Sequence, residues 1–400
     1  IGHLIKHTIH VLFGLGIIYW FHKMPFHYFK ALSIFGIPLV ALLLVYTLFK
    51  GTEIGGANAS RWIQIPFVGV SFQTSTLAFI VIMVYVARYL AKVSDREYSF
   101  KESFFELWVP VGTLLLLILP ANFSTTALIF VMICMLIFIG QYPLKYLGYV
   151  LGFGIASLLL FIILAKAFPD NNFFSRVNTW EKRIERFTND TPNEDDYQIE
   201  KAKIAIASGG LIGLGAGKSV QKNFLPQSSS DFIFAIIVEE WGLLGAIIII
   251  GLYLLLLIRF VINAQKATNL FGKLLIIGLG FPIIFQALVN MGVAVELLPV
   301  TGQPLPLISS GGTSIWMTCI AIGIILSVTK KEEEVALDLE EKRKRDEALQ
   351  QIIDAQIVIN EEHEDQTKVN NLTIKSVIED KNGDVLIDGK NPLDKIINKK

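Results

Sequence analysis

Residues Leu225–Gly245 read LPQSSSDFIFAIIVEEWGLLG, and the interpretation of the remaining chain depends on this stretch. A run of serines leads into Asp231, and an apolar segment containing the pair Glu239–Glu240 follows it. The apolar run that continues beyond the pair is long enough to predict a membrane-spanning helix. A carboxylate at the mouth of such a helix is costly to keep and indicates a functional site. Asp231 also precedes Phe232 where a helix N-cap would stand, so capping is the structural alternative, and the two roles are compatible.

The composition is that of an integral membrane protein. Hydrophobic residues make up 53% of the 400 residues and charged residues 18%, whereas soluble domains carry about a quarter charged residues. Basic and acidic residues number 35 each, and this balance gives no basic surface for nucleic acid. The two cysteines, Cys134 and Cys319, lie in apolar runs and predict buried thiols rather than a disulfide or a metal site.

Nine apolar runs are candidates for membrane-spanning helices, since about 20 residues cross the hydrocarbon layer. They are Leu4–Phe21, Ala31–Phe49, Leu77–Ala91, Leu107–Leu119, Ala127–Gly140, Leu147–Phe168, Phe232–Ile258, Leu274–Leu298 and Ile315–Val328. The fourth and fifth runs are short and predict a tight helical hairpin that turns across residues 120–124. We therefore expect an all-α integral membrane protein, a polytopic bundle with nine spans.

Lysine and arginine in the short loops predict the orientation of this bundle. They recur in every second loop, which assigns those loops and the C-terminus to the cytoplasm. The membrane domain is expected over residues 1–329, with a large outer loop at about 169–230. Residues 330–400 are polar and predict a flexible cytoplasmic tail, in which Glu332–Gln356 form a solvated helix with i,i+4 ion pairs.

The outer loops carry candidate anion-binding residues. Arg61 beside Trp62 favours anchoring at the membrane interface on spacing alone, and the functional alternative is a guanidinium that grips a lipid phosphate. The glycine-rich run 209–217 before Lys218 matches neither a Walker A loop nor GxGxxG. It is consistent either with a backbone that approaches a ligand, with Lys218 as a point charge, or with a re-entrant structural turn.

The last outer loop interrupts the helical pattern near membrane depth. Residues 299–313 include three prolines and a Gly-Gly pair. Irregular backbone at that depth is tolerated where it lines a cavity, so this loop predicts one. Its hydroxyl and amide groups suit an anion or a sugar, and they belong to Ser309, Ser310, Gly311, Gly312 and Thr313.

Four groups of motifs follow one another along the chain. They are Gly56–Ile63 with Phe72-Gln73, Tyr197-Gln198 with Ala205–Gly215, Leu225-Pro226 with Asp231–Ala235 and Glu239–Gly242, and Pro299–Pro306 with Ser309–Gly312. Together they resemble the SEDS family (shape, elongation, division and sporulation), which includes FtsW and RodA. The residues Asp-Phe-Ile-Phe-Ala-Ile from Asp231 onwards are more similar to FtsW than to RodA. The resemblance extends through Val328. Because it implies ten helices, we expect that the first is missing from this sequence.

The sequence departs from the family pattern at three places. The Pro-Ser-Glu that follows Phe-Gln is Thr74-Ser75-Thr76, and the Asp of a later turn is Asn122. Glu296 stands where the resemblance implies glycine. Because Thr76 replaces the family's Glu, any role of that Glu is either absent here or taken by another residue.

The resemblance implies a peptidoglycan glycosyltransferase that polymerises lipid II into glycan strands for septal wall synthesis in cell division. The donor strand is held on undecaprenyl pyrophosphate, and the 4-hydroxyl of lipid II attacks its anomeric carbon with inversion. Asp231 matches the family's essential Asp and would act as the general base. Arg61 and Lys218 would hold the departing pyrophosphate, with Ser309, Gly311 and Gly312 as further substrate-binding candidates.

Supporting roles and cofactors are less defined by the resemblance. Glu240 would orient a helix or a cation, although an intrahelical contact remains open for it, and Gln198 is a second supporting candidate. A divalent cation could share the work of the cations, but the sequence offers no clean ligand set. His3, His7 and His10 share a helix face and favour an interfacial helix end over a metal site, since no carboxylate or cysteine joins them.

The implied partners are a class B penicillin-binding transpeptidase and other divisome proteins in the bacterial inner membrane. Two alternatives are a lipid II flippase and a non-enzymatic division scaffold, since intramembrane acids and broken helices also suit transport. Arg61, Lys218 and Asp231 all map to the outer side, while the inner halves of the helices are apolar. This distribution favours the enzyme.

Overall fold

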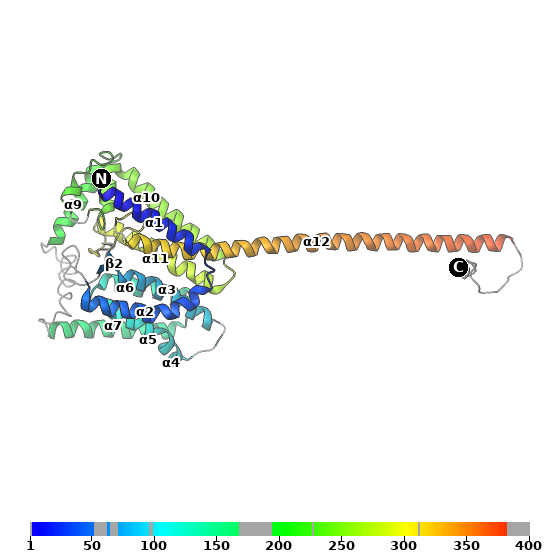
Figure 1. Ribbon diagram of the computed structural model, residues 1–400, viewed down its shortest axis with the longest axis horizontal. Coiled ribbons are helices and arrows are strands. Elements are labelled where there is room, and N and C mark those ends of the chain that lie inside the picture. The colour runs from blue at the N-terminus through cyan, green and yellow to red at the C-terminus, as the bar shows by residue number, and fades with distance from the viewer. Residues whose placement is uncertain are drawn as a thin grey trace. The chain divides into compact units, whose positions relative to one another are not determined.

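The structure is a computed structural model that describes residues 2–51, 62–64, 71–94, 96, 99–167, 194–225, 228–310 and 313–381. Figure 1 shows the arrangement of the elements. In chain order they are α1 (Gly2–Lys23), α2 (Tyr28–Lys50), β1 (Trp62–Gln64), β2 (Ser71–Gln73), α3 (Thr74–Val93), α4 (Phe100–Ser103), the π-helix η1 (Phe104–Trp108), α5 (Val109–Ile118), α6 (Phe123–Ile139), α7 (Leu144–Ala167), α9 (Glu194–Gly209), the 3₁₀-helix η3 (Gln221–Asn223), α10 (Ile233–Lys266), α11 (Leu270–Ala294) and α12 (Thr313–Lys381).

The helical membrane fold predicted from the apolar runs is confirmed, and each of the nine runs overlaps a helix. Within the described residues, six helices are long and apolar enough to cross a membrane. They are α2, α3, α7, α10, α11 and the first part of α12. The apolar helix α6 is shorter. The chain is therefore a multi-pass membrane protein, and the count of nine spans stays a prediction.

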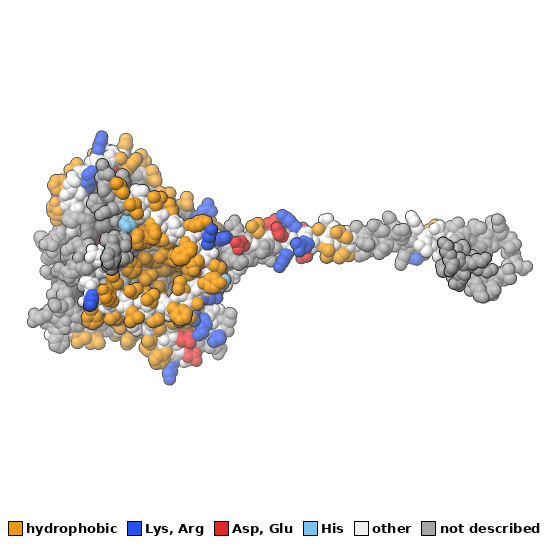
Figure 2. All heavy atoms as spheres, in the orientation of Figure 1, with side chains coloured by type: hydrophobic (Ala, Val, Ile, Leu, Met, Phe, Trp, Pro, Cys, Tyr) orange, Lys and Arg blue, Asp and Glu red, His pale blue; other side chains and the backbone are white. Residues whose placement is uncertain are grey.

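Helices α3 and α11 form the centre of the bundle. Of the apolar 18-residue stretch of each helix, 72% is buried inside the protein in α11 and 56% in α3, but only 11% in α7. The outer helices instead expose large apolar side chains such as Phe49 and Phe153, 84% and 69% exposed. Figure 2 shows such side chains covering the helical part of residues 1–333. A surface of this kind is suited to lipid, because polar side chains would lose their hydration there.

Contacts between helix ends show that the lysine-rich loops lie at the same end of the bundle. The Lys30 ammonium, at the start of α2, lies 5.0 Å from the ring centroid of Phe271, at the start of α11. Ser327 in α12 donates a hydrogen bond to the Met24 carbonyl, which follows α1. The lysine-rich loops thus share one end, as their alternation in the sequence predicts. Their cytoplasmic location stays a prediction.

The predicted hairpin of short helices is present between α5 and α6. The Asn122 side chain caps α6 by accepting a hydrogen bond from the Thr125 amide at 3.2 Å. A second hairpin, of strands, pairs β1 with β2 in antiparallel register and places Trp62 opposite Gln73. Both hairpins lie next to the cavity described below.

Contacts divide the chain into two compact units, residues 1–333 and 334–400. The second unit is helical as far as Lys381, so the helix expected over Glu332–Gln356 extends further than predicted. It carries i,i+4 ion pairs, as expected, for example Lys344–Glu340 at 2.9 Å. The flexibility of this tail stays a prediction.

Candidate functional site

Asp231 lies in the turn before α10, and its backbone is held from two directions. The N-cap of α10 is Phe232, so Asp231 does not occupy the capping position that its sequence context allowed. The Asn290 side-chain amide donates to the Asp231 carbonyl at 2.7 Å, and the Ser309 hydroxyl donates to the Ser230 carbonyl at 2.5 Å. The main chain that carries the carboxylate is therefore fixed by α11 and by the last loop.

The segment that faces Asp231 is irregular, as its prolines predict. A Cβ atom added to Gly302 would lie 3.5 Å from Asp231 Oδ2, so the carboxylate points at this glycine. Asn290 also donates to the Gln303 carbonyl at 2.8 Å, and the Gln303 side chain donates to Thr125 Oγ1 at 2.9 Å. One buried amide thus joins the Asp231 turn to the loop opposite it.

Gly302 and Gln303 border a cavity of about 730 Å³, a volume that includes open solvent. The described residues that line it are all uncharged. Its polar members are Gln73, Thr76, Thr125, Gln286, Gln303, Ser314 and Thr318, and its apolar members include Phe79, Met83, Ile283 and Met317. The expected cavity beside the last outer loop is therefore present. A chamber that is partly apolar and partly amide-lined suits a neutral polar group on a lipid.

The three glutamines of this cavity use their amide N–H groups on the protein. They donate to Ser75 Oγ at 3.0 Å, to the Pro304 carbonyl at 2.9 Å and to Thr125 Oγ1 at 2.9 Å. Among the described residues, none donates to the three side-chain carbonyl oxygens. These oxygens are hydrogen-bond acceptors, and a ligand rich in hydroxyl or amide N–H donors would satisfy them.

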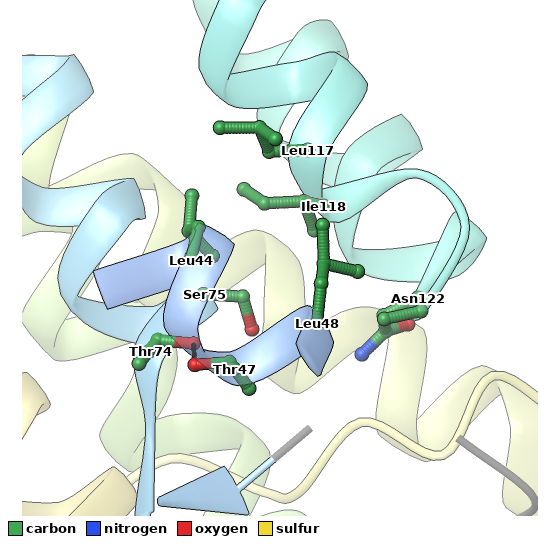
Figure 3. A pocket seen from close by; sticks show the side chains of 9 residues that line it. Leu44, Thr47, Leu48, Thr74, Ser75, Leu117, Ile118 and Asn122 are labelled. Carbon is green, nitrogen blue, oxygen red and sulfur yellow. Dashed lines mark hydrogen bonds between the residues drawn. The ribbon is translucent and has the colours of Figure 1, made fainter. Parts of the chain in front are cut away.

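A smaller pocket of about 270 Å³ lies between α2, α3 and α5 (Figure 3). Five of its nine lining residues are apolar, and a hydrogen bond of 3.1 Å joins the hydroxyls of two others, Thr47 and Thr74. Two of the departures from the family pattern, Thr74-Ser75 and Asn122, border this pocket. They present hydroxyl and amide groups there and no charge.

The glycine-rich run passes close to the first turns of α10. Helix α10 is interrupted at Gly242, whose φ of 66° and ψ of −163° are not helical. The Leu214 and Gly215 amides donate to the carbonyls of Glu239 and Glu240, both at 2.9 Å. The run is thus built into the protein as a packed turn, the structural alternative left open by the sequence. This packing leaves Lys218 exposed beside it.

The remaining predicted residues fall into three groups. Arg61, Gly311 and Gly312 lie outside the described residues. Gln198 is half-buried on α9, and Lys218 is exposed, its amide donating to the Gly215 carbonyl at 3.1 Å. Ser309 is 2% exposed and accepts from the Leu305 amide at 2.7 Å, so its hydroxyl is engaged in holding the loop.

For two residues at the site, Asn290 and Glu239, the sequence predicted no role. Asn290 stood in an apolar run without a motif, although a polar residue inside a span is itself a signal of function. Glu239 is 1% exposed, whereas Glu240, the predicted supporting residue, is half-buried and accepts one long hydrogen bond of 3.4 Å from the Ser219 amide. Periodicity alone could not tell which of two adjacent carboxylates faces inwards.

The part of the chain that the structure describes contains no group of three or more His, Cys, Asp or Glu side chains close enough to share an ion. His10 packs its ring against Trp316, with centroids 5.2 Å apart.

The fold and the site define a multi-pass helical membrane protein with a carboxylate at the border of a cavity whose described lining is uncharged. The chain belongs to the FtsW/RodA/SpoVE family of cell cycle proteins, whose family model matches residues 2–334. The resemblance inferred from the motifs is therefore confirmed.

Similar proteins support this assignment, and similar structures show the same fold. The chain is 31% identical to "Probable peptidoglycan glycosyltransferase FtsW" of Coxiella burnetii over 338 residues, 83% of this chain and 87% of that protein. It is 36% identical to the protein of the same name in Geobacter metallireducens over 300 residues, 73% and 75% of the two chains. A chain of a peptidoglycan synthase complex is similar in fold, with a TM-score of 0.64 at 22% identity over 82% of this chain and 90% of that chain. Thermus thermophilus RodA gives 0.57 at 24% identity, with 82% and 88% covered.

Proposed function

We propose that this protein is a peptidoglycan glycosyltransferase that polymerises lipid II into glycan strands at the outer face of the bacterial inner membrane. The observation that carries the proposal is the Asp231 carboxylate, which faces Gly302 at the border of the uncharged cavity. Relatives named as peptidoglycan glycosyltransferases support it. The similarity to FtsW favours septal wall synthesis in cell division.

The chemistry requires one base and a site for a charged leaving group. The 4-hydroxyl of the lipid II acceptor attacks the anomeric carbon of the donor strand, and the bond from that carbon to the undecaprenyl pyrophosphate oxygen breaks. The pyrophosphate departs with the electron pair, and Asp231 takes the hydroxyl proton. Inversion at the anomeric carbon follows from this single displacement.

The lining of the cavity favours separate binding places for the sugar and the diphosphate of the substrate. Among the described residues, the three glutamine carbonyl oxygens have no donor and suit the hydroxyl and acetamido N–H donors of a sugar, whereas the described lining carries no charge to suit a diphosphate. Cations outside the cavity would hold the pyrophosphate, and Lys218 and Arg61 are our candidates.

A class B penicillin-binding transpeptidase is the proposed partner. A solved structure similar in fold comes from a complex described as coordinating polymerisation and crosslinking. Coupling of the two reactions would deliver a new strand directly to the crosslinking enzyme. Other divisome proteins, a cytoplasmic C-terminus and the inner membrane location belong to the same proposal.

The test is polymerisation in a purified system. We expect the protein reconstituted in detergent or liposomes with lipid II and its transpeptidase partner to form glycan strands longer than the disaccharide, seen by gel electrophoresis after transpeptidation is blocked. The reaction without the partner measures activation. Movement of lipid II across the liposome membrane without strand formation would contradict the proposal and favour the flippase.

A further inference from the structure

A buried carboxylate ties the glycine-rich run to α10 eight positions after Asp231 in the sequence. Glu239 is 1% exposed. Its Oε1 accepts from the Val220 amide at 3.0 Å and the Gln221 amide at 3.3 Å, and its Oε2 accepts from Gln221 at 3.3 Å and from the Ser219 hydroxyl. Bonds to a charged acceptor are stronger than neutral ones, and they offset the cost of burying the charge.

Backbone contacts also join the glycine-rich run to α10. The Leu243 amide donates to the Gly210 carbonyl at 2.9 Å, just beyond the break in α10. A Cβ atom on Gly213 would lie 2.3 Å from the Glu240 carbonyl oxygen, and one on Gly242 would lie 2.4 Å from the Leu211 carbonyl oxygen. The two backbones therefore lie in direct contact, and the Glu239 carboxylate fastens residues 219–221, directly after Lys218.

Lys218 stands between these two attachments. Gly215 precedes it and is bonded to the Glu240 carbonyl, while Ser219 follows it and is bonded to both carboxylates. Its side chain folds over Gly215, since a Cβ atom there would lie 3.8 Å from Lys218 Nζ. The position of the Lys218 backbone relative to α10 is thus set by the contacts of Glu239 and Glu240, and Glu239 makes most of them.

We propose that Glu239 is a positioning residue that holds Lys218 in place for the diphosphate of the lipid-linked substrate. Its carboxylate acts through the 219–221 backbone and does not touch the reacting atoms. The inference rests on the proposed function for the role of Lys218, whereas the fastening of the segment by Glu239 does not. The two parts can therefore be tested separately.

The first experiment measures hydrogen exchange of the full-length protein in detergent micelles. Glu239→Gln keeps the size of the side chain but presents an amide N–H to the donors of residues 219–221. We expect the exchange of the Val220 and Gln221 amides to accelerate by at least about tenfold, the effect of losing a charge-assisted hydrogen bond. In the matched variant Glu240→Gln, exchange at these two amides should stay as in the wild type. Unchanged exchange in Glu239→Gln would overturn the proposal.

The second experiment is a double-mutant cycle on lipid II polymerisation. If Glu239 acts through Lys218, then Glu239→Gln and Lys218→Ala should each raise the KM for lipid II, and the double variant should be no worse than the more impaired single variant. Additive effects would contradict the proposal. If Glu239→Gln does not fold, Ser219→Ala is the milder replacement, because it removes only one donor to Glu239. We expect Ser219→Ala to raise the KM for lipid II without lowering kcat. If Ser219→Ala changes neither this KM nor the hydrogen exchange of the Val220 and Gln221 amides, the proposal is also contradicted.

The outcomes separate this inference from the proposed function. If Lys218→Ala polymerises lipid II normally while Glu239→Gln exchanges faster, the fastening stands and the role of Lys218 in binding diphosphate falls. If no variant, nor the wild type, polymerises lipid II, the proposed function fails, and the exchange data still decide on Glu239.

Discussion

At the scale of single residues, the site depends on how the Asp231 backbone is held. Asn290 is 1% exposed and donates to the Asp231 and Gln303 carbonyls, while its own Oδ1 has no hydrogen-bond partner among the residues that the structure describes. The orientation of the amide is settled by these partners, because both are acceptors. An unpaired buried oxygen is costly, and here it lies where the turn before α10 meets the last loop.

We predict that Asn290→Ala lowers both stability and turnover. Two hydrogen bonds are lost and two carbonyls are left without this donor, at a cost of about 1–3 kcal/mol in the free energy of unfolding. The kcat of lipid II polymerisation should fall about tenfold or more, since a general base must stay within hydrogen-bond reach of its proton.

The matched control is Asn269→Ala on the same helix. Asn269 caps α11 at the opposite end of the bundle, where it accepts from the Phe271 amide at 2.9 Å. Its loss should lower the melting temperature in detergent and leave kcat unchanged below that temperature. Equal losses of kcat in the two variants would show that Asn290 has no particular link to Asp231.

Residue types explain why part of the site was predictable. Asp231 is charged and stands at the start of an apolar run, so its position in the sequence indicates a candidate site. Lys218 follows the glycine-rich run, where the sequence left a ligand-binding backbone and a structural turn as alternatives. Asn290, Gln286 and Gln303 are neutral, and the sequence does not show that they converge on one turn. Glu296, which occupies a position where glycine is expected, has a φ of 61°, and its carboxylate pairs with Lys203 at 2.7 Å. This left-handed backbone favours glycine and gives a physical reason for the expectation.

At the scale of elements, apolar length predicted the helices, and hydrogen bonding explains the exception. The run from Phe232 to Ile258 predicts one continuous helix, and the structure breaks it at Gly242. The break is possible because the glycine-rich run supplies the missing partners: its amides bond to Glu239 and Glu240, and its carbonyls accept from Leu243 and Leu244. No pattern within α10 could indicate this, because the partners come from another part of the chain.

We predict that Gly213→Ala strongly destabilises the protein. The added methyl would meet the Glu240 carbonyl oxygen at 2.3 Å, and the φ of 86° at this position is strained for alanine. Together these effects should cost about 2–4 kcal/mol. Gly251→Ala in α10 is the control, because nothing lies within 4 Å of its added Cβ and its melting temperature should stay near the wild-type value.

A melting curve of each variant in the same detergent measures the difference. A Gly213→Ala protein that melts with the wild type would show that the two backbones can separate without cost. The account of α10 as a helix completed by the glycine-rich run would then be wrong.

At the scale of the whole membrane domain, the architecture places polar groups inside and apolar groups outside. The central helices α3 and α11 carry cavity residues such as Thr76 and Gln286, while α2, α7 and the rest of α10 present apolar side chains outwards. Composition and the apolar runs were enough to predict a helical membrane protein, because the bilayer demands internally satisfied backbones and apolar surfaces. The order in which the helices pack depends on contacts between distant segments and was not predictable.

Whether the Asp231 carboxylate removes the proton from the sugar hydroxyl is tested by the rate at which Asp231→Asn polymerises lipid II. Asparagine has nearly the same shape and cannot accept that proton, so we expect folded, partner-bound protein with strand formation reduced by at least about a hundredfold. Glu200→Gln, an exposed carboxylate on α9, serves as the control and should polymerise normally. Strand formation by Asp231→Asn at the wild-type rate would show that Asp231 is not the general base.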